Sequence, residues 1–230
     1  MKIGGIQKTS LLDYPDEVSA IIWTIGCNFR CPFCYNTDIV LGNAKSIPTK
    51  EVFSFLEKRK KLLDGLVITG GEPLLQEDIF KFCEKVKELS YLIKIDTNGT
   101  FPKKLKELID NNLIDYVAMD IKAPKKKYQN LTNVKVNIKK IEESINVLKN
   151  SKIDYEFRTT FVPELLTKKD IIDIAKWLKN SKKFYLQQFK PISPMISNKL
   201  IGISPYSKEK LMDTIEEIKS YFDICEARGI

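Results

Sequence analysis

Short apolar segments and helical patterns alternate along nearly the whole chain. Residues 17–24 form an almost continuous apolar run, the pattern of a strand buried on both faces of a parallel sheet. Further strand-like segments are residues 66–69, 91–95, 116–119, 155–161 and 184–189. Polar residues and then a helical pattern follow these segments, so the order predicts parallel βα units. Units of this kind carry their functional residues at the C-terminal ends of the strands.

The helices are predicted from apolar periodicity and from capping residues. One helix face is formed, at i, i+3, i+4 and i+7, by Ile79, Phe82, Cys83 and Val86. Residues 167–170 resemble a capping box at the start of another helix. The apolar positions expected in the last helix are Leu211, Ile215, Ile218 and Phe222.

The remaining segments indicate an α/β protein with a single domain over residues 1–230. Residues 1–17 read as a strand or hairpin, residues 123–137 as a basic polar loop, and residues 191–206 as a loop rich in Pro and Ser. A second domain, a repeat or a low-complexity tract is not indicated, and this length suffices for one sizeable core. About six βα units are fewer than the eight of a closed barrel.

Three of the five cysteines form the pattern C-x3-C-x2-C directly after the first parallel strand. A loop of this length can bring Cys27, Cys31 and Cys34 together on one face of an iron–sulfur cluster. Thiolates normally hold all the irons of a cubane cluster. Because the motif supplies only three ligands, one iron would lack a protein ligand. An open coordination position is what a metal centre needs to bind and activate a substrate, as catalytic zinc sites do.

Other readings of these cysteines stay open at this point. A zinc site, and with it a binding module without turnover, would need a fourth ligand, and the chain has no histidine. Cys83 and Cys225 could supply it, but both fall in helix-like segments. Apart from the zinc reading, Cys83 is expected to be a buried inert thiol, and Cys225 has no assigned role. A disulfide framework is not expected in a long chain without marks of secretion.

At the cysteine loop the chain resembles the radical S-adenosylmethionine enzymes. Their signature is C-x3-C-x2-C followed by an aromatic residue, here Tyr35. Within this family the chain is similar to the activating enzymes of glycyl radical proteins, above all to the anaerobic ribonucleoside-triphosphate reductase activating proteins. The segments that carry the similarity are residues 7–15, 27–36, 70–73, 96–99, 119–122 and 157–160.

The resemblance implies a fold, cofactors and partners. The implied fold is a partial (β/α)6 TIM-like barrel with parallel strands and an open side. The implied cofactors are a 4Fe–4S cluster on the three cysteines and S-adenosylmethionine, whose amino and carboxylate groups chelate the fourth iron. Reductive cleavage would yield a 5′-deoxyadenosyl radical that takes a hydrogen atom from a glycine of a glycyl radical enzyme, either anaerobic ribonucleoside-triphosphate reductase or a pyruvate formate-lyase-like enzyme. A reductant such as flavodoxin or ferredoxin is also implied, and a small-molecule substrate is the alternative.

The resemblance also assigns residues to the cofactor. The backbone of Gly70 and Gly71 is expected to bind the amino group of S-adenosylmethionine, with Glu72 nearby. Tyr35 is expected to lie against the adenine, mostly through its backbone. Glycines in such a turn also permit close backbone approach, and a tight βα turn without a ligand is the simpler alternative for this segment.

Two aspartates that end neighbouring strands should point into one mouth of the barrel. Asp96 and Asp120 would repel each other unless a cation lay between them. The resemblance implies that they and Thr97 help to bind a monovalent cation against the cofactor carboxylate. Lys122 and Arg158, also at strand ends, are expected to pair with the cofactor carboxylate or the partner's backbone, with surface salt bridges as the alternative. One of Gln187 and Gln188 should face the cavity, but which one is left open.

The chain departs from a common pattern of the activating enzymes in one residue. Many of them have Cys-His-Asn at the third cysteine, whereas this chain has Cys34-Tyr35-Asn36. Any aromatic residue fits the signature, but a histidine-dependent step is excluded. The cysteine-bearing insert of some activating enzymes is absent, so one cluster is expected.

Charge and hydropathy bear on partners and location. The net charge of +8 raises nucleic acid or acidic lipid as a partner. The lysines alternate with acidic residues, however, as in 81–88, and the densest run, 125–127, is short. We therefore expect a solvated surface and no nucleic-acid or membrane partner. No apolar run approaches the roughly 20 residues that span a bilayer, and the first residues lack a signal-peptide core, so a cytoplasmic location is expected.

Overall fold

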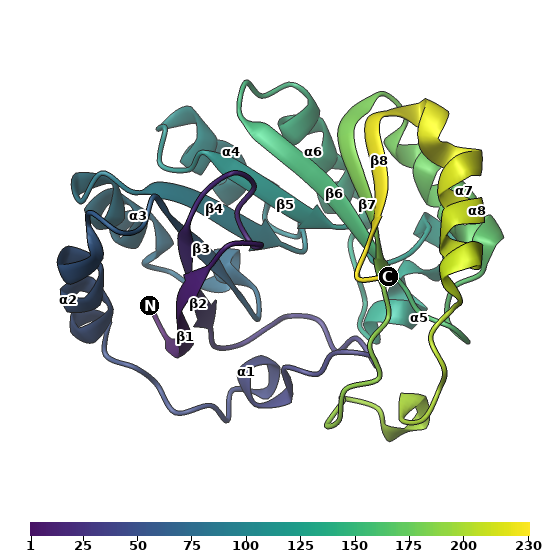
Figure 1. Ribbon diagram of the computed structural model, residues 1–230, viewed down its shortest axis with the longest axis horizontal. Helices are drawn as coiled ribbons and strands as arrows, with labels where there is room; N and C mark the ends of the chain where they lie inside the picture. Colours follow the sequence, from purple (N-terminus) through teal and green to yellow (C-terminus); the bar gives the residue numbers. More distant parts are fainter.

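The eight strands form one curved sheet in which they follow one another in chain order (Figure 1). The computed structural model describes residues 1–230. The strands are Ile3–Ser10 (β1), Ser19–Thr24 (β2), Gly65–Gly70 (β3), Leu92–Thr97 (β4), Tyr116–Asp120 (β5), Asp154–Phe161 (β6), Ser181–Gln188 (β7) and Phe222–Arg228 (β8). Strands β2 to β8 pair in parallel, and β1 pairs with β2 antiparallel. Strands β1 and β8 each have one neighbour, so the barrel stays open between them.

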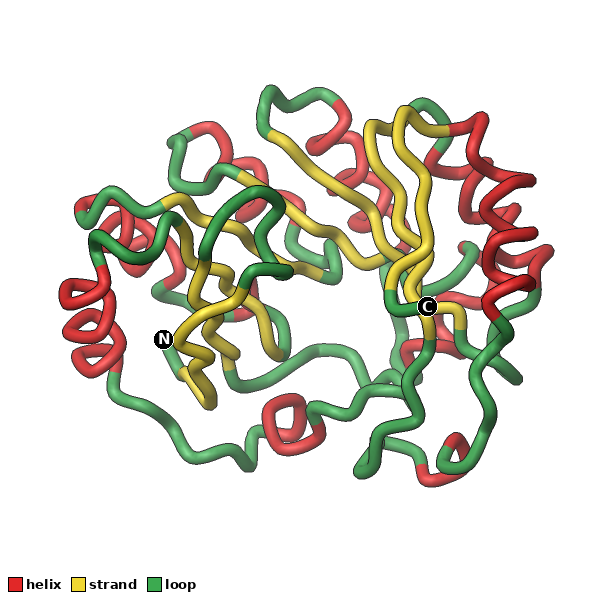
Figure 2. The backbone as a smooth tube through the Cα atoms, in the orientation of Figure 1, coloured by secondary structure: helices red, strands yellow, loops and turns green.

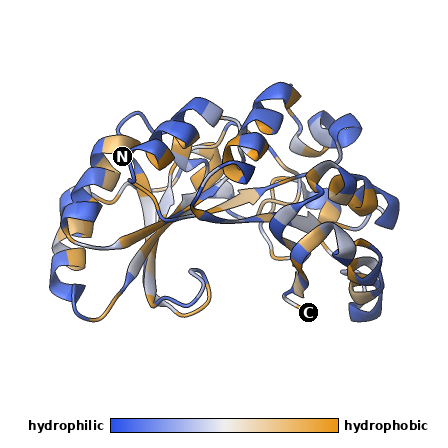
Figure 3. Ribbon diagram, turned by 90° about the horizontal axis from the view of Figure 1, so that it is seen from above, coloured by the Kyte–Doolittle hydropathy of each residue, from blue (hydrophilic) through white to orange (hydrophobic).

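Most of the helices cover the convex face of the sheet, with apolar faces turned toward it and polar faces turned outward, whereas α1 lies in the long loop after β2 (Figures 1 and 3). The α-helices are Thr37–Leu41 (α1), Thr49–Arg59 (α2), Ile79–Glu88 (α3), Pro102–Asp110 (α4), Tyr128–Thr132 (α5), Ile138–Lys149 (α6), Lys168–Leu178 (α7) and Lys208–Ile218 (α8). Short 3-10 turns lie at Pro73–Leu75, Lys125–Lys127, Asn198–Leu200 and Lys219–Tyr221. The expected capping box of α7 is present. None of the helices has the length and apolar character needed to span a bilayer.

The expected α/β partial barrel is confirmed, and the main difference lies at the C-terminus. Helix α8 ends at Ile218, and Phe222 begins β8 rather than ending the helix. The Phe222 ring stacks on that of Phe184 in β7, with centroids 4.9 Å apart. Cys225 therefore lies in a strand, not in a helix. Strand β8 is an edge strand with few buried side chains, so its sequence lacks the apolar run of the inner strands.

The segment predicted as a basic loop at residues 123–137 contains the short helix α5. Its Tyr128 side chain is fully buried and meets the ring of Phe29 edge-on, at a centroid distance of 6.3 Å. The three lysines before it are not buried. This segment therefore packs against the cysteine loop instead of projecting into solvent. The 191–206 segment is mainly loop, as expected, with one 3-10 turn.

Candidate functional site

A cavity of about 510 Å³ lies on the concave side of the curved sheet, at the C-terminal ends of the strands. All of the predicted site residues except Glu72 line it: Cys27, Cys31, Cys34, Tyr35, Gly70, Gly71, Asp96, Thr97, Asp120, Lys122 and Arg158. Both Gln187 and Gln188 also line it. Residues from five neighbouring strands, β3 to β7, and from the cysteine loop thus converge on one space, as the βα order predicted.

The cysteine loop leaves the end of β2 and is held by segments distant in sequence. The Arg30 N–H donates to the carbonyl of Thr132 in α5 at 2.9 Å. The Ile196 N–H donates to the carbonyl of Cys34 at 3.0 Å, so the loop after β7 also clamps it. The long loops after β2 and β7 lie at the same end of the sheet (Figure 2). The positions of the three thiols are therefore set by tertiary contacts as well as by the local spacing.

Two glycines let the turn after β3 pack on the base of the cysteine loop. Gly70 has φ +112°, which favours glycine, and a Cβ there would lie 2.4 Å from the backbone nitrogen of Thr24. A Cβ on Gly71 would lie 1.9 Å from the carbonyl oxygen of Gly26. The absence of a side chain at Gly70 and Gly71 thus allows this turn to pack closely against the chain's own backbone at Thr24 and Gly26. It brings the turn into the same cavity wall as the thiols.

Glu72 lies behind the cavity wall rather than in it. Its carboxylate is fully buried and accepts hydrogen bonds from the N–H of Leu74 (3.0 Å), the hydroxyl of Thr97 (2.7 Å) and the N–H of Asn98 (2.7 Å). The side chain therefore ties the turn after β3 to the end of β4. Its contact with the cavity is indirect, through the residues it holds.

Burial raises the pKa of the Glu72 carboxyl to about 7, against an ordinary value of 4.5. A raised pKa in the folded state contributes stability that is complete below the unfolded pKa and is lost as the pH rises through the folded pKa. We therefore expect the free energy of unfolding of the wild type, relative to Glu72→Gln, to fall by about 3 kcal/mol between pH 4.5 and pH 7.5. Urea denaturation at a series of pH values measures it. Parallel pH profiles of the two proteins would contradict the expectation.

Asp96 and Asp120, which end neighbouring strands, form one cluster with cationic side chains. Arg158 on β6 joins them: its Nε lies 2.9 Å from Asp120 Oδ1 and its Nη1 lies 3.1 Å from Asp96 Oδ2. Lys122 Nζ lies 3.1 Å from Asp120 Oδ2, and Lys94 Nζ lies 2.5 Å from Asp96 Oδ1. Lys122 and Arg158 are thus partly buried within the cavity, and they do not form surface salt bridges.

Although burial raises the pKa of the Asp120 carboxyl, Arg158 and Lys122 together lower it to about 2. The pKa of Asp96 is likewise lowered, because Arg158 and Lys94 outweigh the effect of burial. Both carboxylates are therefore ionised at neutral pH. Asp96, Asp120, Lys122 and Arg158 thus form a polar wall of the cavity that the thiols also line.

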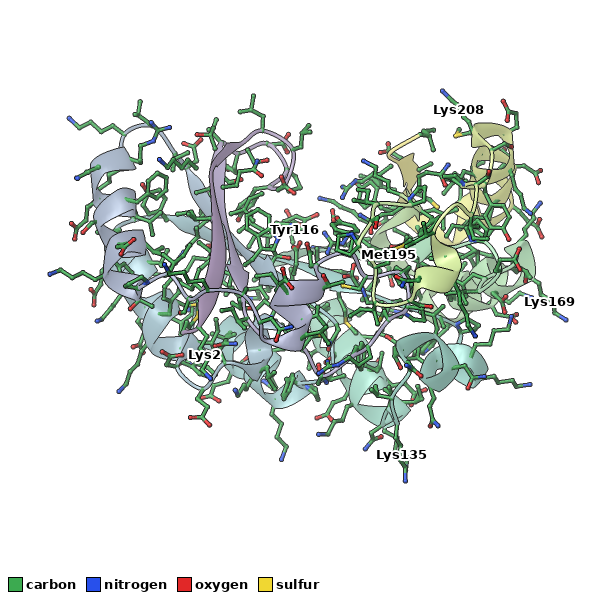
Figure 4. The ribbon with its side chains drawn as sticks, turned by 90° about the horizontal axis from the view of Figure 1, so that it is seen from below. Lys2, Tyr116, Lys135, Lys169, Met195 and Lys208 are labelled. Atoms are coloured by element: carbon green, nitrogen blue, oxygen red, sulfur yellow. The ribbon has the colours of Figure 1, made fainter.

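A second ion pair, partly buried, lies on the β6 to β8 side, and the sequence did not predict it. Arg228 on β8 donates to both oxygens of Glu156, at 2.7 and 2.9 Å, and the hydroxyl of Tyr116 donates to Glu156 Oε2 at 2.9 Å. Tyr116 lies in the interior, whereas Lys135, Lys169 and Lys208 point outward (Figure 4). Arg228 lines the cavity and completes its polar side.

The comparisons with known proteins agree with this site. The chain matches the radical SAM superfamily over residues 21–178. The chain belongs to the radical SAM superfamily. It is 38% identical over 194 residues to a Methanocaldococcus jannaschii protein named “Putative glycyl-radical enzyme activating enzyme”, which covers 82% of this chain and 80% of that protein. A second M. jannaschii protein of the same name is 27% identical over 184 residues, covering 77% and 68%.

The fold agrees with solved structures of this kind. SuiB of Streptococcus suis, solved with S-adenosylmethionine bound, superposes with a TM-score of 0.68 at 17% identity. The likeness covers 90% of this chain and 49% of SuiB, so the chain spans about half the length of that protein. At this level of identity the likeness concerns the fold, which is the radical SAM partial barrel.

Membership of the radical SAM superfamily brings a 4Fe–4S cluster and S-adenosylmethionine as cofactors. The donor set fits the cluster: Cys27, Cys31 and Cys34 are free thiols that face one cavity. No group of three His, Cys, Asp or Glu side chains is arranged to hold a single metal ion, as the zinc alternative would require. A cluster places each thiolate on a different iron, so its ligands lie farther apart than those of a single metal ion.

The cysteine thiols need a cluster, or another strong positive charge, to ionise. Burial raises the pKa of Cys27 to about 11 and that of Cys31 to about 12, and the thiolates also repel one another. Burial raises the pKa of Cys34 as well. Lys122 acts in the opposite direction on all three. Cluster assembly in this radical SAM protein is therefore expected to release protons, because thiolates are the ligands.

Proposed function

We propose that this radical SAM protein is an activating enzyme that generates a glycyl radical on a partner protein. The observation that carries the proposal is the 38% identity to a named activating enzyme over 82% of this chain and 80% of that relative. The open side of the barrel, between β1 and β8, supports it, because a protein loop needs a lateral entrance to the cavity.

The residues have separate parts in the proposed reaction. When bound, the cluster and S-adenosylmethionine supply one-electron reductive cleavage of the sulfonium and abstraction of a hydrogen atom. Cys27, Cys31 and Cys34 hold the cluster. The turn at Gly70 and Gly71 receives the cofactor's amino group through carbonyl oxygens.

Further residues orient the cofactor and the substrate loop. Lys122 and Arg158 are cations of the polar wall and attract the cofactor carboxylate. The two aspartates hold these cations in place, and Thr97 ties the end of β4 to Glu72. Tyr35, half-exposed at the cavity, contacts the adenine. The buried network around Glu72 keeps these elements fixed, so that the reacting atoms are presented in one geometry.

The proposed partner is an anaerobic ribonucleoside-triphosphate reductase, with a pyruvate formate-lyase-like enzyme as the second choice. The supporting features are the motif similarities at residues 7–15, 96–99 and 119–122. A flavodoxin or ferredoxin is the proposed electron donor. The lysines of 125–127 precede α5, which packs on the cysteine loop. Lys125 and Lys127 pair with Glu142 and Asp170, so Lys126 is the lysine of this run that would meet an acidic donor protein.

The proposal is tested with the partner itself. The reconstituted, reduced protein is mixed anaerobically with S-adenosylmethionine and an anaerobic ribonucleoside-triphosphate reductase, and the spin resonance spectrum is recorded. We expect a carbon-centred glycyl radical that appears only with the cofactor and is absent from a reductase whose radical glycine is replaced by alanine. Formation of 5′-deoxyadenosine at the same rate with and without reductase or pyruvate formate-lyase, and no protein radical, would refute it and favour a small-molecule substrate.

A further inference from the structure

The two aspartates of the polar wall already have a cation from the chain at every carboxylate oxygen. Asp96 has Lys94 at Oδ1 (2.5 Å) and Arg158 at Oδ2 (3.1 Å). Asp120 has Arg158 at Oδ1 (2.9 Å) and Lys122 at Oδ2 (3.1 Å). Three protein cations thus surround two carboxylates, and this group of five side chains carries one net positive charge.

This arrangement does not fit the monovalent cation that the sequence resemblance implied. Thr97, the third expected ligand, is also engaged elsewhere: its hydroxyl donates to Glu72 at 2.7 Å and accepts from the N–H of Gly99 at 3.1 Å. A metal cation would have to enter a group that is already positive, within a partly buried cavity where charges are weakly screened. The oxygen atoms that could bind a metal ion are therefore present, but each already pairs with a group of the chain itself.

Lys94 supplies the cation that occupies Asp96 Oδ1. It lies on β4 two positions before Asp96, so both side chains point to the same face of the strand. The Lys94 side chain is only 2% exposed, and its Nζ has Asp96 as its anionic partner. A buried ammonium normally requires such a partner. Lys94 does not itself line the cavity, but it places a monovalent positive charge on Asp96 Oδ1 from behind the cavity wall.

We propose that the Lys94 ammonium, with Arg158 and Lys122, replaces a monovalent metal ion as the counter-charge of Asp96 and Asp120, so that S-adenosylmethionine binds without K⁺ or Na⁺. The proposal rests on the cofactors of the radical SAM superfamily and not on the proposed glycyl radical partner. The charge state supports it, because Arg158 and Lys122 outweigh burial and lower the pKa of Asp120 to about 2. The carboxylates therefore stay ionised, and the protein's own cations balance them across the neutral pH range.

The first test uses the wild-type holoprotein without reduction, so that no turnover is involved. The Kd for S-adenosylmethionine is measured by isothermal titration calorimetry in potassium chloride, in sodium chloride and in choline chloride at equal ionic strength. We expect the three values to agree within about twofold. Binding that is about tenfold or more tighter in potassium or sodium than in choline would overturn the proposal. Failure of the partner to form a radical would leave this result unaffected.

The second test removes the charge with Lys94→Met, which retains side-chain length. Asp96 Oδ1 then lacks its cation, so we expect cofactor binding to weaken about tenfold in choline, the order of one lost charge-assisted hydrogen bond, and to recover in potassium. The matched control is Lys106→Met on the exposed face of α4, which should behave as the wild type in every salt. Equal binding by Lys94→Met in choline and potassium would show that Lys94 has no such role. If Lys94→Met does not fold, the wild-type salt comparison still decides the proposal.

Discussion

Replacement of Cys31 by alanine should abolish cleavage of S-adenosylmethionine. Cys31 is 6% exposed and faces the same cavity as Cys27 and Cys34, and no fourth cysteine lines that cavity to take its place as a thiolate ligand. We expect iron content after reconstitution to fall sharply and 5′-deoxyadenosine formation to drop below about 1% of wild type, since even an outer-shell change at a metal site costs roughly 10–100-fold. Iron and sulfide analysis and a timed 5′-deoxyadenosine assay measure both effects.

The matched control for this variant is Cys83→Ala. Cys83 is fully buried in α3 and does not line the cavity. Its replacement should leave iron content and cofactor cleavage close to wild type, with only a modest loss of stability. Retention of cleavage by Cys31→Ala would exclude the three-cysteine cluster site.

Replacement of Gly71 by alanine should disrupt the site without touching a cofactor-facing side chain. The added Cβ would lie 1.9 Å from the carbonyl oxygen of Gly26, which is backbone and cannot rotate away. The turn after β3 must then separate from the base of the cysteine loop. We expect the free energy of unfolding to fall by about 1–3 kcal/mol, as for overpacking in a core. A displacement of about 1 Å can cost roughly 100-fold in rate, so cofactor cleavage should fall by a similar factor.

Gly42→Ala separates this steric effect from ordinary backbone strain. Gly42 ends α1 with φ +85° and has open space around the position of a Cβ. Its replacement should cost about 1–2 kcal/mol of stability through strain alone and should leave cofactor cleavage nearly unchanged. Thermal unfolding and the 5′-deoxyadenosine assay distinguish the two variants. Wild-type cleavage by Gly71→Ala would show that the packing of the two turns does not position the site.

The parallel strands and most of the cavity could be predicted from the sequence because their signals are local. The cysteine spacing is contiguous, and Asp96 and Asp120 each end an apolar segment that reads as a buried strand. In a parallel sheet such strand ends meet at one edge, so the approach of these residues follows from the element order alone. The close packing of Gly71 on Gly26 does not follow, because it depends on how two turns meet in space.

Strand β8 and the residues it brings could not be predicted in the same way. The segment 222–228 mixes apolar and charged residues and lies at an edge, and its strand conformation depends on pairing with β7 and on the stacking of Phe222 on Phe184. Arg228 reaches Glu156 across 72 positions of sequence. The sequence around Glu156 does not indicate Arg228 as its partner, and the reverse is also true. The ion pair therefore follows only from the three-dimensional fold.

Helix α5 and Lys94 were missed for different reasons. Tyr128 looked like part of a basic loop because its burial depends on Phe29, which is distant in sequence. Lys94, by contrast, had a local signal: its place two residues before Asp96 put a lysine on the interior face of a strand. A charged residue on that face requires a partner, and Asp96 was available.

The most direct measurement is anaerobic reconstitution of the wild-type protein with iron and sulfide, followed by reduction and addition of S-adenosylmethionine. The spin resonance spectrum of the cluster is recorded before and after the cofactor is added, and 5′-deoxyadenosine is assayed. A shifted cluster signal and formation of 5′-deoxyadenosine are the predicted result, because the fourth iron is open to the cofactor. A cluster that assembles but neither changes its signal nor cleaves the cofactor would contradict the assignment of this cavity as a radical SAM active site.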